Sequence, residues 1–219
     1  MALFEAIEAG SRGNVRSVLE ADPSRAGSRS ATGVSAILWA LYRNHHDIVE
    51  ALLEVGPALD VFDAAALGRL DRLTELVDAD PEQANAWSAD GFTPVGLAAF
   101  FGQPEAVRLL IERGADVHAV ARNEMRVQPL HAATAASDVE SVRMILEAGA
   151  DPNAEQQKGF TPLMAARLHD DQAIIDLLLA HGAQDPEAHD APVHDAPVHD
   201  APVRAGQADE ASGNRSTTS

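Results

Sequence analysis

The sequence predicts an all-α solenoid of about six helix-turn-helix units in a row, followed by a disordered tail. Three observations support this fold class. Sequence features recur about every 33 residues, apolar residues fall at helical spacing in each unit, and hydrophobic residues make up 46% of the chain although only 4% are aromatic. Many of the apolar residues are alanine. Since small side chains let helices approach closely, we expect stacked helices rather than one large core.

The repeat is visible when the chain is compared with itself. Ala21-Asp22-Pro23 recurs as Ala79-Asp80-Pro81, and the later units are marked by Pro94, Pro129 and Pro162. Spacing of this kind is typical of repeat architectures, in which each unit stacks on its neighbours. The predicted units are residues 1–32, 33–60, 61–90, 91–125, 126–158 and 159–185.

Each unit contains two helical patterns. The second carries an apolar i, i+3, i+4 stripe, such as Val107, Leu110 and Ile111. The first is rich in alanine. In the later units it opens with a hydroxyl or amide residue that can cap the helix, and a proline follows at the first turn, where no hydrogen bond is lost. These openings are Thr93-Pro94, Gln128-Pro129 and Thr161-Pro162. Left-handed C-caps are predicted at Asn44, Gly68 and Gly102 after the first helix and at Gly56, Gly114, Gly149 and Gly182 after the second.

The motifs at the start and end of the units resemble the ankyrin repeat. They include Gly91-Phe92-Thr93-Pro94, Gln128-Pro129-Leu130-His131-Ala132-Ala133 and Gly149-Ala150-Asp151-Pro152-Asn153-Ala154, and the resemblance covers about residues 3 to 185. The chain resembles a small bacterial-type ankyrin repeat protein. The resemblance implies loops that project as β-hairpin fingers. It also implies a structural role for His131, whose ring should hydrogen-bond neighbouring backbone.

Some units depart from the family pattern. Between Gly56 and Phe62 there is almost no room for a finger, so we expect that finger to be absent. The loop from Asp116 to Arg126 is longer than its counterparts and has Arg126 where the others have glycine. The last unit is apolar for a terminal repeat, which leaves open a homo-oligomer that pairs through Ile174 and Leu178.

The tail, residues 186–219, has a different composition. His189-Asp190-Ala191-Pro192-Val193 recurs from His194 and again from His199. A proline in every five residues forbids a helix, and large apolar residues are few, so this segment is predicted to be disordered. Imidazole and carboxylate are both metal ligands, so a metal-binding role of the tail is an alternative function. A period of five in a flexible chain fixes no coordination geometry.

The charge of the chain restricts its partners. It has 34 Asp and Glu against 16 Lys and Arg, a formal charge of −18. Nucleic acids and anionic membranes would be repelled, because binding to either depends on basic side chains. A basic protein partner is favoured instead. The chain has no apolar run long enough to span a membrane, no signal peptide and no cysteine, so we expect a cytoplasmic protein.

No catalytic motif is present in the sequence. It contains no phosphate-binding glycine loop, no Gly-x-Ser-x-Gly elbow and no His-Glu-x-x-His pair. His45-His46-Asp47 lies where the family has its inter-helix turn, so we interpret it as a turn and helix cap. We therefore predict a protein that is not an enzyme, with no catalytic residues, no metal site and no cofactor.

By resemblance, the residues that follow the first helices and the fingertips face a concave groove. Aromatic residues, Met and Arg, which are enriched in interface cores, occupy several of these positions. We therefore predict a monomeric scaffold that binds an unidentified protein there, although Phe92 and one of Phe100 and Phe101 could instead pack under a finger. The predicted partner-binding residues are Tyr42, Arg43, Leu67, Trp87, Phe92, Phe100, Phe101, Met125, Leu168 and His169.

Overall fold

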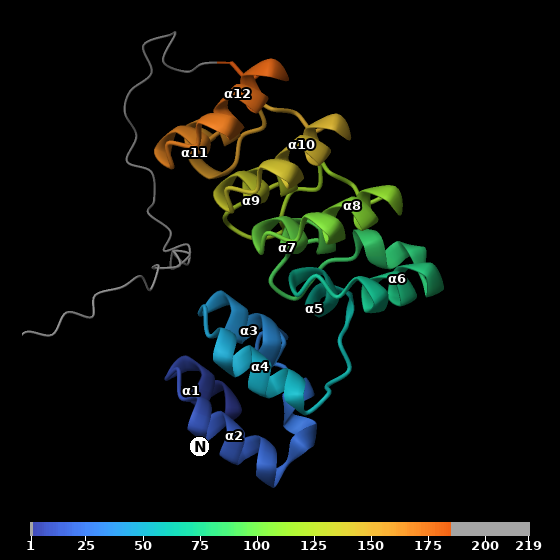
Figure 1. The fold of residues 1–219 in the computed structure, drawn as a ribbon, viewed down its shortest axis with the longest axis vertical. Helices are drawn as coiled ribbons and strands as arrows, with labels where there is room; N and C mark the ends of the chain where they lie inside the picture. Colours follow the sequence, from blue (N-terminus) through green and yellow to red (C-terminus); the bar gives the residue numbers. More distant parts are fainter. Residues whose placement is uncertain (1, 185–219) are drawn as a thin grey trace, which may run out of the picture.

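The computed structural model describes residues 2–184, and the predicted disorder of residues 186–219 falls outside them (Figure 1). Apart from one isolated β-bridge, the regular secondary structure of residues 2–184 is helical. Its α-helices are α1 (Leu3–Glu8), α2 (Arg12–Ala21), α3 (Ala36–Tyr42), α4 (His46–Glu54), α5 (Val61–Ala66), α6 (Leu70–Ala79), α7 (Pro94–Phe100), α8 (Pro104–Glu112), α9 (Pro129–Ala135), α10 (Val139–Glu147), α11 (Pro162–Leu168) and α12 (Gln172–Ala180). Three short 3₁₀ turns are η1 (Pro23–Gly27), η2 (Pro81–Asn85) and η3 (Gln157–Gly159).

The helices form consecutive antiparallel pairs that stack into an elongated rod (Figure 1). The first helices of the pairs, from α1 to α11, pack side by side in one row, and the second helices lie beside them in another. The predicted all-α stack of paired helices is thus confirmed. One pair falls within each predicted unit, while the unit boundaries themselves stay a prediction.

Most of the predicted helix ends form as expected. The Thr93 and Thr161 hydroxyls accept hydrogen bonds from the third residue of α7 and α11, and all the predicted left-handed C-cap positions have positive φ. Gln128 and His45 occupy the N-cap positions of α9 and α4, as predicted, but their side chains do not cap the helices. Both side chains are larger than the Ser, Thr, Asp and Asn side chains that favour this position.

The buried core is built largely from alanine on the first helices and from branched aliphatic residues on the second. Ala98, Ala99 and Ala133 are fully buried, as are Leu110 and Ile145. The core divides into two clusters, one centred on α1–α4 and the other on α5–α12. Repeats therefore bury their apolar faces mainly against their neighbours, and Leu97 of α7 also belongs to the α1–α4 cluster.

The fingers are tight turns rather than paired strands. The finger before α7, for example, closes with backbone hydrogen bonds from Ser88 N to Phe92 O at 2.9 Å and from Gly91 N to Ser88 O at 3.0 Å. The only β-bridge in residues 2–184 joins Arg29 to Ser35. Residues 55–60 connect α4 to α5 without such a turn, as predicted for the missing finger. In the longer loop the closing bond runs from Ala121 N to Val127 O.

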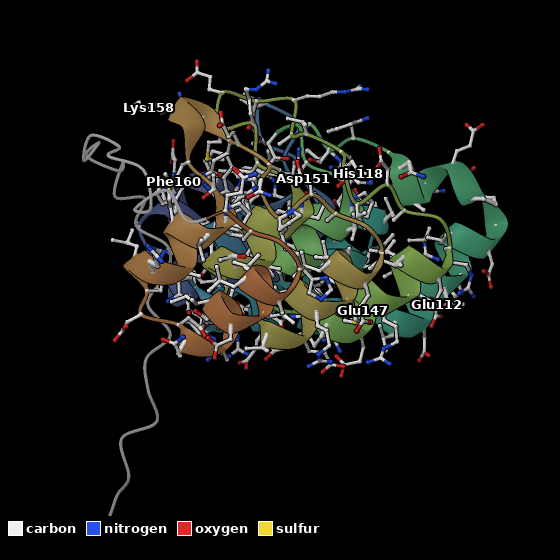
Figure 2. The ribbon with its side chains drawn as sticks, turned by 90° about the horizontal axis from the view of Figure 1, so that it is seen from above. Glu112, His118, Glu147, Asp151, Lys158 and Phe160 are labelled. Atoms are coloured by element: carbon white, nitrogen blue, oxygen red, sulfur yellow. The ribbon has the colours of Figure 1, made fainter. Side chains whose placement is uncertain are left out.

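Arg126 shows how the longer loop keeps the family register. Its φ is +54°, where Gly91 and Gly159 have φ of +85° and +74°. The extra residues are therefore absorbed inside the turn, and the helix that follows begins at the same point of the repeat. Viewed along the stack, Lys158 lies at the edge formed by the fingers, while Glu112 and Glu147 lie on the opposite side of the helices (Figure 2).

His131 has the structural role implied by the resemblance. Its side chain is buried, and its Nε2 lies 3.3 Å from the carbonyl oxygen of Phe160 in the next repeat. Burial lowers the pKa of the imidazole to about 4. The ring is therefore neutral at pH 7 and links two repeats by a hydrogen bond rather than by charge.

Adjacent fingers are also linked through their backbones, and this close approach requires Gly91. The carbonyl oxygen of Gly91 accepts a 2.8 Å hydrogen bond from the Arg122 amide, and a Cβ on Gly91 would lie 2.8 Å from the Arg122 carbonyl. Gly114 serves as a comparison because its φ is also positive, at +81°. A Cβ added to Gly114 would meet no atom within 4 Å apart from those of Gly114 itself and its chain neighbours.

We predict that Gly91→Ala lowers the free energy of unfolding more than Gly114→Ala does. Both variants bear the left-handed backbone cost of roughly 1–2 kcal/mol, but only Gly91→Ala also collides with backbone. Urea denaturation followed by circular dichroism measures the difference. Equal losses would show that the two fingers separate without cost, which would contradict a tight finger contact.

Candidate protein-binding groove

The helix register places the predicted groove residues along one edge of the stack. Tyr42, Phe100 and Leu168 are the last residues of α3, α7 and α11. Arg43, Leu67, Phe101 and His169 are the C-caps of α3, α5, α7 and α11. Because the first helices pack side by side in one direction, these C-terminal ends form a single row.

Three of the predicted rings form an aromatic cluster, which we define as Tyr42, Phe100 and Phe101. The ring centroid of Tyr42 lies 5.6 Å from that of Phe101 and 6.4 Å from that of Phe100, and the two phenylalanine centroids are 5.0 Å apart with nearly perpendicular planes. Edge-to-face contacts of this kind are favourable. The rings are half-buried and pack against both core clusters, so they stabilise the stack and keep part of their surface exposed.

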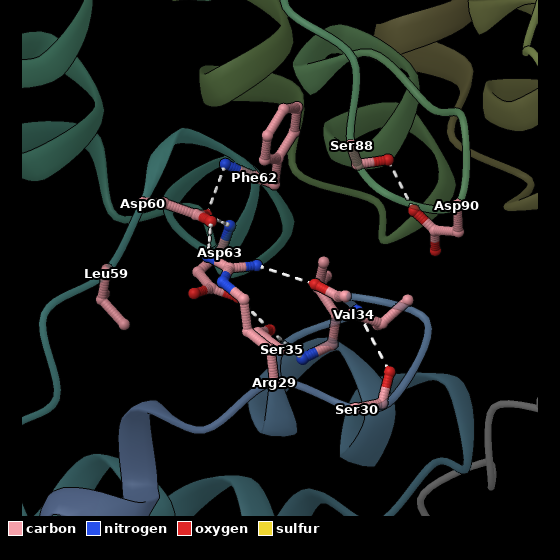
Figure 3. Close-up of polar contacts among 12 residues, drawn as sticks. Arg29, Ser30, Val34, Ser35, Leu59, Asp60, Phe62, Asp63, Ser88 and Asp90 are labelled. Atoms are coloured by element: carbon pink, nitrogen blue, oxygen red, sulfur yellow. Dashed lines mark hydrogen bonds and ion pairs between the residues drawn. The ribbon is translucent and has the colours of Figure 1, made fainter.

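The hydroxyl of Tyr42 fixes the cluster to a finger. It donates a 2.7 Å hydrogen bond to Asp90 Oδ2. Ser88 Oγ donates to the other oxygen of Asp90 at 2.5 Å (Figure 3). Burial, followed by the nearby Asp90 carboxylate, raises the pKa of Tyr42 well above its usual range. The phenol therefore stays protonated and acts as a permanent donor that joins α3 to the finger preceding α7.

Arg43 is held by the first repeat rather than extending freely into the groove. Its guanidinium donates to Glu8 Oε1 at 2.7 Å and lies 5.5 Å from the centroid of the Trp39 ring. Trp39 Nε1 donates to the same Glu8 oxygen at 2.8 Å, and its ring meets Phe4 edge-on. The sequence analysis missed Trp39. Its position one helical turn before Tyr42 and Arg43 places it on the same helix face and could have identified it.

The predicted fingertip residues are not part of the aromatic cluster. The Arg122 guanidinium from the next finger lies 4.1 Å from the centroid of the Trp87 ring, a favourable cation–π geometry. Phe92 is half-buried against the core of α1–α4, as the packing alternative proposed. Met125 uses its backbone, accepting a hydrogen bond from the Gln157 amide at 3.2 Å. Trp87 and Met125 thus take part in contacts between neighbouring fingers.

The residues in this row become more exposed toward the last repeat. Ala135 and Ala136 are half-buried, His169 is exposed, and Leu168 is 65% exposed. Ile174 and Leu178, through which the alternative homo-oligomer would pair, are fully buried. Helix α12 packs against α11 and α10, so these two side chains are not exposed to a second copy, and Leu179 is exposed instead.

No group of His, Asp or Glu in residues 2–184 could hold a metal ion, and the His-Asp copies from residue 189 lie outside this range. One enclosed cavity, beneath the finger that precedes α9, has a volume of about 10 Å³, which is space for no more than a water molecule. In the same part of the chain, no helix is both long and apolar enough to span a membrane.

Three named proteins are similar in sequence to parts of the chain. It is 28% identical over 154 residues to Ankyrin repeat and SAM domain-containing protein 6 of Rattus norvegicus, covering 66% of this chain and 14% of that protein. It is 32% identical over 178 residues to E3 ubiquitin-protein ligase KEG of Arabidopsis thaliana, covering 80% and 9%. It is 38% identical over 80 residues to DNA-binding protein RFXANK of Homo sapiens, covering 36% and 31%. The chain thus spans less than a third of each of these relatives. All three are eukaryotic and distant, so they give no support to a bacterial type.

The family comparison agrees with the geometry. The model described as Ankyrin repeats (3 copies) matches residues 61–156 and 126–190, more than half of the chain. Ankyrin repeats are generally protein-protein interaction modules and are typically not catalytic. The chain therefore belongs to the ankyrin repeat family.

Proposed function

We propose that this protein is a non-catalytic scaffold that binds a partner protein through the groove along the C-terminal ends of the first helices. The aromatic cluster carries this proposal. Tyr42, Phe100 and Phe101 hold one another and Asp90 in a fixed arrangement while remaining partly exposed. Rigid aromatic groups at a concave surface lose little conformational entropy on binding and are frequent hot spots of interfaces.

The rest of the groove suits an extended contact. From the aromatic cluster it continues over the small side chains of Ala135 and Ala136 to the exposed Leu168. A partner segment could therefore approach the backbone closely in the middle and place apolar side chains at both ends. An interface of standard size would bury about 800 Å² on each protein.

The charge distribution favours a basic partner. Several arginines of the outer helices are already engaged with carboxylates, including Arg108 with Glu140 and Arg113 with Asp78. The chain as a whole carries a charge of −18. An excess of negative charge accelerates association with a basic protein and disfavours an acidic one.

The groove is tested by filling it at a position that contributes little to packing. Ala136 is the C-cap of α9, with φ of −80° and ψ of −4°. Ala148 is the C-cap of α10, with φ of −75° and ψ of 1°, and is exposed on the second row of helices. We predict that Ala136→Trp reduces partner binding at least tenfold, whereas Ala148→Trp leaves it unchanged. A tenfold loss corresponds to about 1.4 kcal/mol.

The measurement is affinity capture with the native chain as bait, followed by titration of the captured protein against both variants. Circular dichroism verifies that the variants keep the helical content of the native chain. If Ala136→Trp binds as well as the native chain, or Ala148→Trp loses binding equally, the partner uses another surface and the proposal fails.

The expected partner charge gives a separate prediction. The association rate should fall as salt is raised from low concentration to physiological ionic strength, because the Debye length shortens to about 8 Å. Stopped-flow mixing at several salt concentrations measures this dependence. A rate that is insensitive to salt, or that rises with it, would exclude attraction between an acidic scaffold and a basic partner.

A further inference from the structure

The stack is interrupted between the second and third helix pairs. The second helices α4 and α6 lack the close packing that joins α2 to α4, α6 to α8, α8 to α10 and α10 to α12, and α3 and α5 make the least contact of the neighbouring first helices. The two hydrophobic clusters also divide close to this point, with Ala66 of α5 and Leu97 of α7 packed in the α1–α4 cluster. Figure 1 shows α3 and α4 set apart from α5 and α6, with residues 55–60 running between them.

The missing finger accounts for this interruption. Later fingers are joined by backbone hydrogen bonds, from the Arg122 amide to the Gly91 carbonyl and from the Gln157 amide to the Met125 carbonyl. No such bond joins residues 2–54 to residues 61–184. Instead, Gly33 in the finger before α3 faces Ala89 in the finger before α7, where a Cβ added to Gly33 would lie 2.8 Å from the Ala89 side chain.

Side chains hold the two parts together. Ser35 Oγ donates a 2.5 Å hydrogen bond to Asp63 Oδ1 in a buried position at the start of α5. Next to it, Arg29 forms an ion pair with Asp60, whose carboxylate also accepts hydrogen bonds from the amides of Phe62 and Asp63 (Figure 3). The third link is the bond from Tyr42 to Asp90 with the adjoining ring contacts.

We propose that this junction is a hinge between two blocks, α1–α4 and α5–α12, and that the buried Asp63–Ser35 pair is its latch. The side-chain links can separate without breaking any helix or finger. Because Tyr42 belongs to one block and Phe100 and Phe101 to the other, the hinge angle sets the geometry of the aromatic cluster. An effect of the hinge angle on partner binding rests on the function proposed above. The existence of the hinge does not depend on that function.

The latch responds to pH because Asp63 is 3% exposed. Burial, followed by the charge of Asp60, raises the pKa of Asp63 to about 6, although the Ser35 hydroxyl, Arg29 and a backbone hydrogen bond within the Asp60 cap act in the opposite direction. In an open junction the carboxyl group is hydrated and has its ordinary pKa of 3.8. The closed state thus favours the protonated acid. The ratio of open to closed molecules should rise by up to about tenfold per pH unit from about pH 4 to pH 6 and level off above pH 6.

Spin-label distances test this hinge directly, since the native chain has no cysteine and introduced cysteines label uniquely. One pair, Glu50→Cys with Glu112→Cys, spans the junction, and a control pair, Glu112→Cys with Glu147→Cys, lies within the second block. All three glutamates are exposed. Distance distributions measured between pH 4.5 and pH 7.5 should broaden toward longer distances with rising pH for the junction pair only.

Two matched variants assign the effect to Asp63. Asp63→Asn keeps an acceptor for Ser35 but cannot ionise, so the distribution of the junction pair should stay narrow at every pH. Asp71→Asn makes the same change at an exposed position on α6 and should retain the native pH dependence. In the native background, a junction-pair distribution that is as narrow as the control-pair distribution and does not change with pH would overturn the hinge. A pH dependence that survives Asp63→Asn would overturn the latch.

Discussion

Contact between neighbouring repeats is the constraint on which the rest of the structure depends. Alanines such as Ala98, Ala99 and Ala133 let the first helices approach closely, and the repeats bury their apolar faces mainly against their neighbours. The continuity of such a stack is limited by the interface between repeats that has the least contact. That interface follows α4, where residues 55–60 replace a finger and polar side chains such as Ser35 and Asp63 provide the contact that backbone and helix packing provide elsewhere.

The same interruption shapes the candidate binding surface. With no finger before α5, the fingers before α3 and α7 come together, and Tyr42 can reach Asp90, Phe100 and Phe101. An aromatic cluster therefore forms from residues far apart in the sequence, at the place where the rod is least continuous. If the groove binds a partner there, the partner contacts both blocks and holds the junction in one geometry.

Local features of the fold could be predicted from the sequence. The repeat period, the missing finger, the left-handed C-caps and the buried His131 follow from residue types with strong conformational or packing preferences. The row of groove residues followed from the register. What escaped prediction depends on how neighbouring repeats are rotated and spaced: the bond between Tyr42 and Asp90, the ring of Trp39 beside Arg43, and the burial of Asp63. Hydrophobic periodicity places Ile174 and Leu178 on one helix face but does not specify whether that face points to α10 or to solvent.

The most direct test of a rod divided into two blocks uses its two tryptophans, because Trp39 lies in α3 and Trp87 in the finger before α7. Trp39→Phe and Trp87→Phe leave one fluorescent reporter in each block. In urea at pH 7.5, the Trp39 reporter should show unfolding of α1–α4 at a lower concentration than the Trp87 reporter shows for α5–α12, since the first block has fewer repeat interfaces. Coincident transitions for both reporters would show one cooperative unit and contradict the account.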